Sequence, residues 1–142
     1  MYIQLHEDPG VRSFSELFTH TLSLIPQEAY GNLTTVLGPI TAHTVEVRNM
    51  NICKIAEHEM ALAESGWWVI CLSTFQGTYQ RLLRELDIRT YPREIIDWFI
   101  FPLIESGHLS VAHVRENYGS SFGTKLEHAK LIQVGVPIEY VS

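Results

Sequence analysis

The stretch WWVICLST, from Trp67 to Thr74, decides the fold that the sequence predicts. It is apolar almost without interruption, and this composition is typical of a strand that other elements cover on both faces. A strand with one face in water would alternate apolar and polar residues instead. We therefore expect Trp67 to Thr74 to lie near the centre of a sheet.

The sequence before this strand predicts a mixture of strands and helices. Met1 to His6 alternates as a strand does, and Ser13 with Glu16 has the spacing of a capping box at a helix start. Threonines and valines on both sides of Gly38-Pro39 predict a hairpin of two strands, Asn32 to Leu37 and Thr41 to Arg48. A helix from Met50 to Ser65 then leads to Gly66 and the central strand.

After the central strand the pattern becomes helical. Gln76 to Leu86 is amphipathic, and Glu94 to Ser106 is the most hydrophobic helix that the sequence predicts, with Pro102 as the expected position of a kink. A helix that is apolar nearly all round is either buried or lies in an interface. The residues expected in a subunit interface are Trp98, Phe99 and Phe101.

Together these elements predict an α+β fold. We expect a small mixed or antiparallel sheet flanked by helices, with a C-terminal module that resembles a helix-turn-helix. The α+β core would span residues 1–90, and the helical module would span residues 91–142 and pack on the same core.

Composition narrows the classes of function. Ten basic and 16 acidic residues give a formal net charge of −6, which argues against a surface that wraps nucleic acid. Charged residues make up 18% of the chain, below the roughly 25% of an average domain, so apolar surface remains for a second copy or a partner. The two cysteines, Cys53 and Cys71, lie in apolar contexts that predict buried, reduced thiols.

The segment from Ser110 to Val136 predicts two short helices joined by a tight turn. Ala112 would be the small residue between them, Gly119 would take a positive φ at the turn, and Ser120 or Ser121 would cap the second helix. The inward positions of that helix would be Leu126, Ala129 and Ile132.

The run Gly119-Ser120-Ser121-Phe122-Gly123-Thr124 resembles the G-x-S-x-x-T turn of winged helix-turn-helix transcription regulators. The resemblance covers residues 93–140 and implies a recognition helix that reads base edges, used by a dimer. Residues 110–135 carry a net charge of only +1, and the same geometry also serves protein contacts. The nucleic-acid-binding residues that the resemblance implies are Arg115, Ser121, Phe122, Thr124, Lys125, His128 and Lys130.

The chain offers few candidates for catalysis. Its seven histidines do not have the spacing of a zinc pair, and no phosphate-binding glycine loop is present, so we expect no metal and no cofactor. His6, Tyr79 and Glu139 follow the His, Tyr, Glu order of one class of ADP-ribosyltransferases, which makes them the candidate catalytic residues.

The sequence favours a non-enzymatic regulatory or binding protein, a homodimer or higher oligomer that contacts DNA or a protein through the helix-turn-helix. One alternative is a small acidic viral-type inhibitor or ligand-binding protein that acts through protein or small-molecule contacts. A second is a small ADP-ribosyltransferase-like enzyme. No apolar run approaches the about 20 residues of a membrane span, so we expect a cytoplasmic protein without a membrane partner.

Overall fold

The computed structural model describes residues 2–4, 10–40, 42–75 and 93–142, and its strands form a single five-stranded sheet. The strands are β1 (Tyr2–Gln4), β2 (Leu33–Leu37), β3 (Trp68–Cys71), β4 (Ala112–Arg115) and β5 (Ile138–Val141). Their order is β1-β3-β2-β4-β5, and every pair is parallel. The expected α+β fold with a mixed or antiparallel sheet is therefore wrong, since parallel strands joined through helices make an α/β fold.

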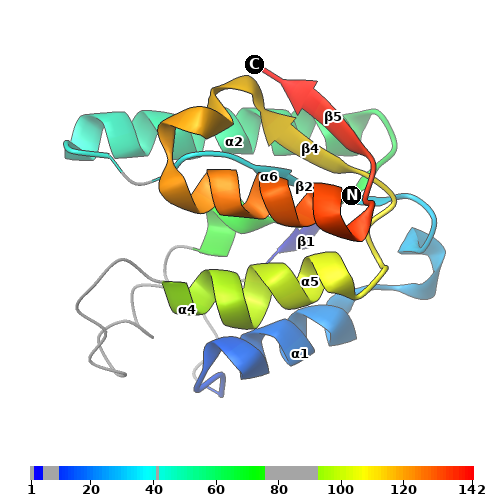
Figure 1. Ribbon diagram of the computed structural model, residues 1–142. Helices are drawn as coiled ribbons and strands as arrows, with labels where there is room; N and C mark the ends of the chain where they lie inside the picture. The colour runs from blue at the N-terminus through cyan, green and yellow to red at the C-terminus, as the bar shows by residue number, and fades with distance from the viewer. Residues whose placement is uncertain (1, 5–9, 41, 76–92) are drawn as a thin grey trace.

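The helices cover both faces of this sheet (Figure 1). The α-helices are α1 (Phe14–Leu24), α2 (Val45–Glu64), α4 (Arg93–Ile95), α5 (Phe101–Glu105) and α6 (Phe122–Val134). The π-helical segment is η3 (Ile96–Ile100), and the 3-10 turns are η1 (Gln27–Ala29), η2 (Leu72–Phe75) and η4 (Glu116–Ser120). In Figure 1, α2 lies on one face, while α1, α5 and α6 lie on the other.

The middle strand is β2, and all five of its residues are buried. Leu33 and Leu37 belong to the large apolar cluster under α1, α5 and α6. Thr34 and Val36 alternate to the opposite face, toward α2. The stretch from Trp67 to Thr74 was expected near the centre of the sheet, and β3 is an interior strand that lies between β1 and the middle strand β2.

Helix α2 begins where the sequence predicted the second strand of a hairpin. The Oγ1 atom of Thr44 accepts a hydrogen bond from the backbone N–H of Val47 at 3.2 Å, and Glu46 lies in the first turn. A threonine cap and an early acidic residue both stabilise a helix N-terminus. They outweigh the strand preference of Val45 and Val47, so the predicted hairpin is wrong.

The predicted apolar helix spans α4, η3 and α5 without a break. Proline lacks an N–H group, and its ring crowds the carbonyl four residues earlier. Here the turn before Pro102 widens instead, because the N–H of Phe101 donates to the carbonyl of Ile96, five residues back. The π-helical turn therefore accommodates Pro102 within a helical segment.

The first helix of the expected helix-turn-helix is a strand. Ala112–Arg115 forms β4, which pairs with β2 on one side and β5 on the other. Val111, Ala112 and Val114 are buried in the sheet. The prediction was wrong because pairing with two distant strands decides the conformation of this short run, and local spacing cannot show that pairing.

The second helix of that expected pair is present as α6, with its ends where the sequence placed them. Ser121 caps it by accepting from the N–H of Thr124 at 3.4 Å, and Gly135 ends it with a φ of 89°. Gly119 lies inside η4 and is not among the glycines with positive φ. Ala129 and Ile132 are exposed rather than inward, while Gly123, Thr124 and Leu131 are buried.

Candidate ligand-binding crevice

A crevice of about 680 Å³ opens at the carboxyl ends of β2 and β4, the two strands at the middle of the parallel sheet. The chain leaves β2 toward α2 on one face and leaves β4 toward α6 on the other, so the two connections diverge. Ligands of open α/β sheets bind at such a topological switch point. The lining residues are Ala42, His43, Thr44, Val47, Ser120, Ser121, Phe122 and Gly123.

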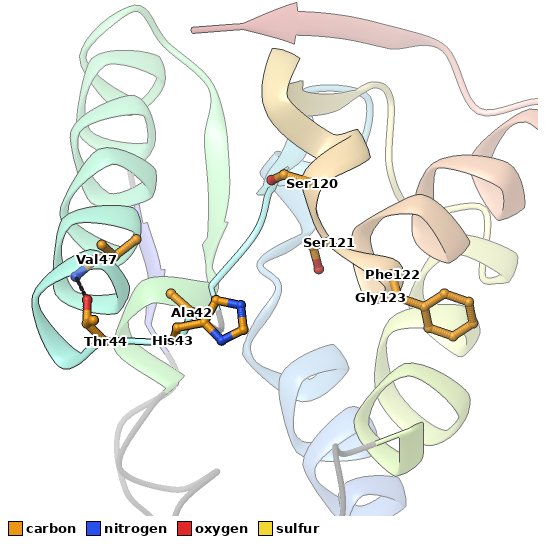
Figure 2. Close-up of a pocket in the computed structure, with 8 residues that line it drawn as sticks. All are labelled: Ala42, His43, Thr44, Val47, Ser120, Ser121, Phe122 and Gly123. Carbon is orange, nitrogen blue, oxygen red and sulfur yellow. Dashed lines mark hydrogen bonds between the residues drawn. The ribbon is translucent and has the colours of Figure 1, made fainter.

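The two sides of the crevice are alike in construction (Figure 2). On one side Thr44 caps α2, and on the other side Ser121 caps α6. Each hydroxyl satisfies one backbone N–H of the first turn, by accepting from Val47 and Thr124 respectively. The other N–H groups of a first helical turn have no partner within the helix. The positive ends of two helices, of 20 and 13 residues, therefore meet the crevice.

Figure 2 shows which side chains face the gap. The imidazole of His43 projects from the loop before α2, and the hydroxyl of Ser120 points toward the α2 side. Ser120 also donates to the carbonyl of Asn117 at 2.9 Å, which holds the loop between β4 and α6. The ring of Phe122 turns away from the gap. The described lining contains no carboxylate, although the chain as a whole is acidic.

A second polar group of residues lies on the α2 face of the sheet. The Nδ1 atom of His113 is 2.7 Å from Oγ1 of Thr34, and its Nε2 atom is 3.2 Å from a carboxylate oxygen of Glu139. Trp67 packs edge-on against the imidazole, with 5.7 Å between the ring centroids. Burial lowers the pKa of His113, and this effect exceeds the opposite influence of Glu139.

Glu59 and Cys71 form a third buried polar pair, near the end of β3. The carboxylate of Glu59 accepts hydrogen bonds from the backbone N–H and the hydroxyl of Ser73. Burial nevertheless raises the pKa of Glu59, and burial together with the nearby Glu59 raises the pKa of Cys71 to about 12. Cys71 is therefore a protonated thiol, as its predicted burial implies, whereas Cys53 is exposed on α2, contrary to prediction.

The structure separates the residues that were expected to bind nucleic acid. Ser121 and Phe122 line the crevice, but Arg115 ends a strand and Thr124 is buried. His128 lies between two aromatic side chains. Its ring stacks on that of Tyr118, with 4.0 Å between the ring centroids, and its Nε2 atom is 2.8 Å from the hydroxyl of Tyr140.

The two expected lysines differ in their surroundings as well. Lys130 pairs with Glu105 at 3.3 Å and lies over the ring of Phe101, whereas Lys125 is exposed. In this part of the chain β4 stands where the first helix was expected, and the basic side chains lie in different environments.

The expected interface residues divide in the same way. Trp98 is 57% exposed, Phe101 is half-buried, and Phe99 is fully buried in the core.

Of the catalytic candidates, Glu139 lies on β5 beside His113, while His6 and Tyr79 fall outside the described residues. In the parts of the chain that the structure describes, no three His, Cys, Asp or Glu side chains gather as a metal site. Nor does any helix in those parts have the length and apolarity to cross a membrane.

Sequence reasoning missed His43, Thr44 and Ser120 as site residues. A signal for Thr44 exists, because the buried strand Asn32 to Leu37 is followed within a short loop by a threonine that can cap a helix. The signal was obscured by the valines that follow Thr44.

Comparisons of the chain with protein-family models, with curated proteins and with solved structures found no match.

Proposed function

We propose that the protein is a binding module whose crevice between β2 and β4 holds a small molecule with an anionic group. The observation that carries this proposal is the position of the crevice at the switch point of the parallel sheet. Its volume of about 680 Å³ lies within the range of small-molecule sites. The switch point is where open α/β sheets hold ligands, and the polar groups of the lining select the kind of ligand.

The lining favours an anionic group over a cationic one. Two helix N-termini and the imidazole of His43 face the gap, together with the hydroxyls of Ser120 and Ser121. Unpaired N–H groups at a helix start bind phosphate, sulfate or carboxylate, and the helix dipole favours a negative charge there. A cation would meet no carboxylate among the described lining residues.

This proposal replaces the helix-turn-helix account and keeps the broader expectation of a binding protein. A ligand-binding protein was one of the alternatives that the sequence left open, and the crevice favours that alternative. Self-association stays a prediction, and exposed Trp98 on η3 is the residue that favours it. The transferase alternative depends on His6 and Tyr79, which lie outside the described residues.

Aspartate at a helix N-cap tests the proposal without removing the cap. Aspartate caps helices as well as serine does, so Ser121→Asp and Thr44→Asp keep α6 and α2 while placing a negative charge at the crevice. We expect either substitution to weaken binding of ATP or inorganic phosphate at least about tenfold, because like charges repel. Isothermal titration calorimetry measures the affinity.

The matched control is Ser13→Asp, which makes the same change at the N-cap of α1. Ser13 accepts from the N–H of Glu16 at 3.1 Å, as Ser121 does from Thr124, but it does not line the crevice. We expect this variant to bind as the unmodified protein does. Equal weakening by Ser13→Asp, or unchanged binding in both crevice variants, would overturn the proposal.

A further inference from the structure

The two sides of the crevice differ in their side chains, although each begins a helix. On the α2 side the described lining includes the apolar side chains of Ala42 and Val47. On the α6 side Phe122 turns its ring away from the gap, which leaves the hydroxyls of Ser120 and Ser121. Among the described residues, the crevice therefore has an apolar surface toward α2 and a polar surface toward α6.

Two polar side chains also come from the α2 side. The hydroxyl oxygen of Thr44 accepts from the N–H of Val47 at 3.2 Å and so acts as the cap of α2. The imidazole of His43 extends into the gap (Figure 2). His43 is therefore the group from this side that can donate to an anion bound at α6.

The first turns of the two helices differ in charge as well. Glu46 lies in the first turn of α2, where its carboxylate offsets the positive end of the helix dipole. The first turn of α6 contains no acidic residue, and the nearby Lys125 is exposed. An anionic group of a ligand is therefore more stable at α6 than at α2.

Gly123 gives a ligand close access to the backbone of α6. It is the second residue of the helix, it lines the crevice, and its N–H has no partner within the helix. Ser121 satisfies the N–H of Thr124 instead, at 3.4 Å. Because glycine has no Cβ, an anionic oxygen can approach this part of the turn without meeting a side chain.

The size of the crevice fits more than an anionic group. Its volume of about 680 Å³ lies in the range of sites for organic ligands, far above the space that one phosphate or carboxylate fills. Val47 is 42% exposed, and Met50, one turn further along α2 on the same side, is exposed as well. An apolar group that covers Val47 removes this surface from water and so stabilises the complex.

We propose, on the basis of the anion site described under the proposed function, that the crevice takes its ligand in one orientation. The anionic group lies against Ser120, Ser121 and Gly123, and an apolar body packs on Ala42 and Val47. The class of ligand is then an organic anion, a phosphate or carboxylate joined to an aromatic or aliphatic group. Inorganic phosphate occupies only the polar half of the site and binds more weakly.

Two phosphonates with the same anionic group and different bodies test this orientation. Methylphosphonate carries one methyl group, and phenylphosphonate carries an aromatic ring. Each buried methylene-sized group raises the affinity about fourfold, so we expect phenylphosphonate to bind at least about tenfold more tightly than methylphosphonate. Isothermal titration calorimetry with the full chain measures both affinities.

Substitutions on the two sides should affect the two ligands differently. Val47→Ala removes two methyl groups from the apolar surface, so phenylphosphonate should bind at least about threefold more weakly, and methylphosphonate should bind as before. Ser120→Ala removes a donor to the anionic group, so both phosphonates should weaken by the same factor, about tenfold.

The matched control for the apolar side is Val45→Ala. Val45 lies in the same turn of α2 and is 60% exposed, but it is not among the residues that line the crevice. We expect this variant to keep the full preference for phenylphosphonate. Nuclear Overhauser contacts from the phenyl protons should reach the methyl groups of Ala42 and Val47.

The outcomes separate this inference from the function on which it rests. If neither phosphonate binds, the anion site fails and the orientation fails with it. Equal affinity for the two phosphonates would leave the anion site in place and overturn the apolar contact. A preference that survives Val47→Ala, or that Val45→Ala abolishes, would also overturn that contact, as would phenyl contacts to Phe122 in place of Val47.

Discussion

The two cysteines occupy opposite environments, although the sequence around both is apolar. Cys53 is exposed on α2, and Cys71 is buried at the end of β3 beside Glu59. With a pKa of about 12, Cys71 has only about one thiolate in ten thousand at pH 8. Because the thiolate is the reactive form, the two side chains should differ sharply toward an alkylating reagent.

We expect iodoacetamide to modify one thiol of the folded protein at pH 8 and two in guanidinium chloride. Intact-mass spectrometry counts the adducts, and Cys53→Ser should leave the folded protein unmodified on the same timescale. Rapid modification of Cys71 in the folded Cys53→Ser variant would contradict the environment described for β3.

At the scale of single residues, the sequence predicts caps better than it predicts buried polar contacts. Ser13 and Ser121 cap the helices that the sequence assigned to them, because a cap depends on residues three positions away. His113 meets Thr34 from 79 positions away, and Glu139 from the next strand. Such contacts follow from strand order, which local spacing along the chain does not reveal.

Glycines at two positions distinguish α6 with its strand from the helix-turn-helix that the sequence predicted. Gly135 has a φ of 89°, where an L side chain is strained, whereas Gly119 has no positive φ and open space around its missing Cβ. We expect Gly135→Ala to lower the free energy of unfolding by about 1–2 kcal/mol and Gly119→Ala to be neutral or mildly stabilising.

Chemical denaturation measures both variants against the unmodified protein. A helix-turn-helix turn at Gly119 would require a positive φ there and would reverse the order of the two effects. Greater destabilisation by Gly119→Ala than by Gly135→Ala would therefore contradict the structure of this segment.

At the scale of elements, the sequence predicted helices with strong local signals and missed the strands β4 and β5, whose conformations are set by distant partners. The helices α1 and α6 were predicted correctly in position, and the strands β2 and β3 were found. The strand β4 was mistaken for a helix, because its four residues are held by pairing with β2 and β5. The start of α2 was mistaken for a strand, since β-branched residues follow its threonine cap.

At the scale of the whole molecule, strand order decides where a ligand site can form. The sequence contains each βα junction, but it does not show that β4 pairs with β2 rather than with β3. That pairing brings residues 42–47 and 120–123 together from distant parts of the chain. No sequence motif therefore marks the crevice, although Ser121 and Phe122 also belong to the segment that resembles a helix-turn-helix.

The net charge of the whole chain differs from the charge around the crevice. A formal charge of −6 disfavours anionic ligands at long range, yet the described lining of the crevice contains no acidic residue. At 0.1 M salt, surface charges more than about 10 Å from the site are largely screened. The helix N-termini and His43, which lie at the site, therefore dominate there. Anion binding should therefore be favoured at moderate ionic strength.

The most direct test of the switch-point site is an amide NMR titration of the full chain with ATP, and with uncharged adenosine as the control. We predict that ATP shifts the backbone amides of residues 42–47 and 120–124 together and in a saturable manner, and that adenosine shifts them much less. Saturable shifts confined to other elements, or equal shifts with adenosine, would contradict an anion site between α2 and α6.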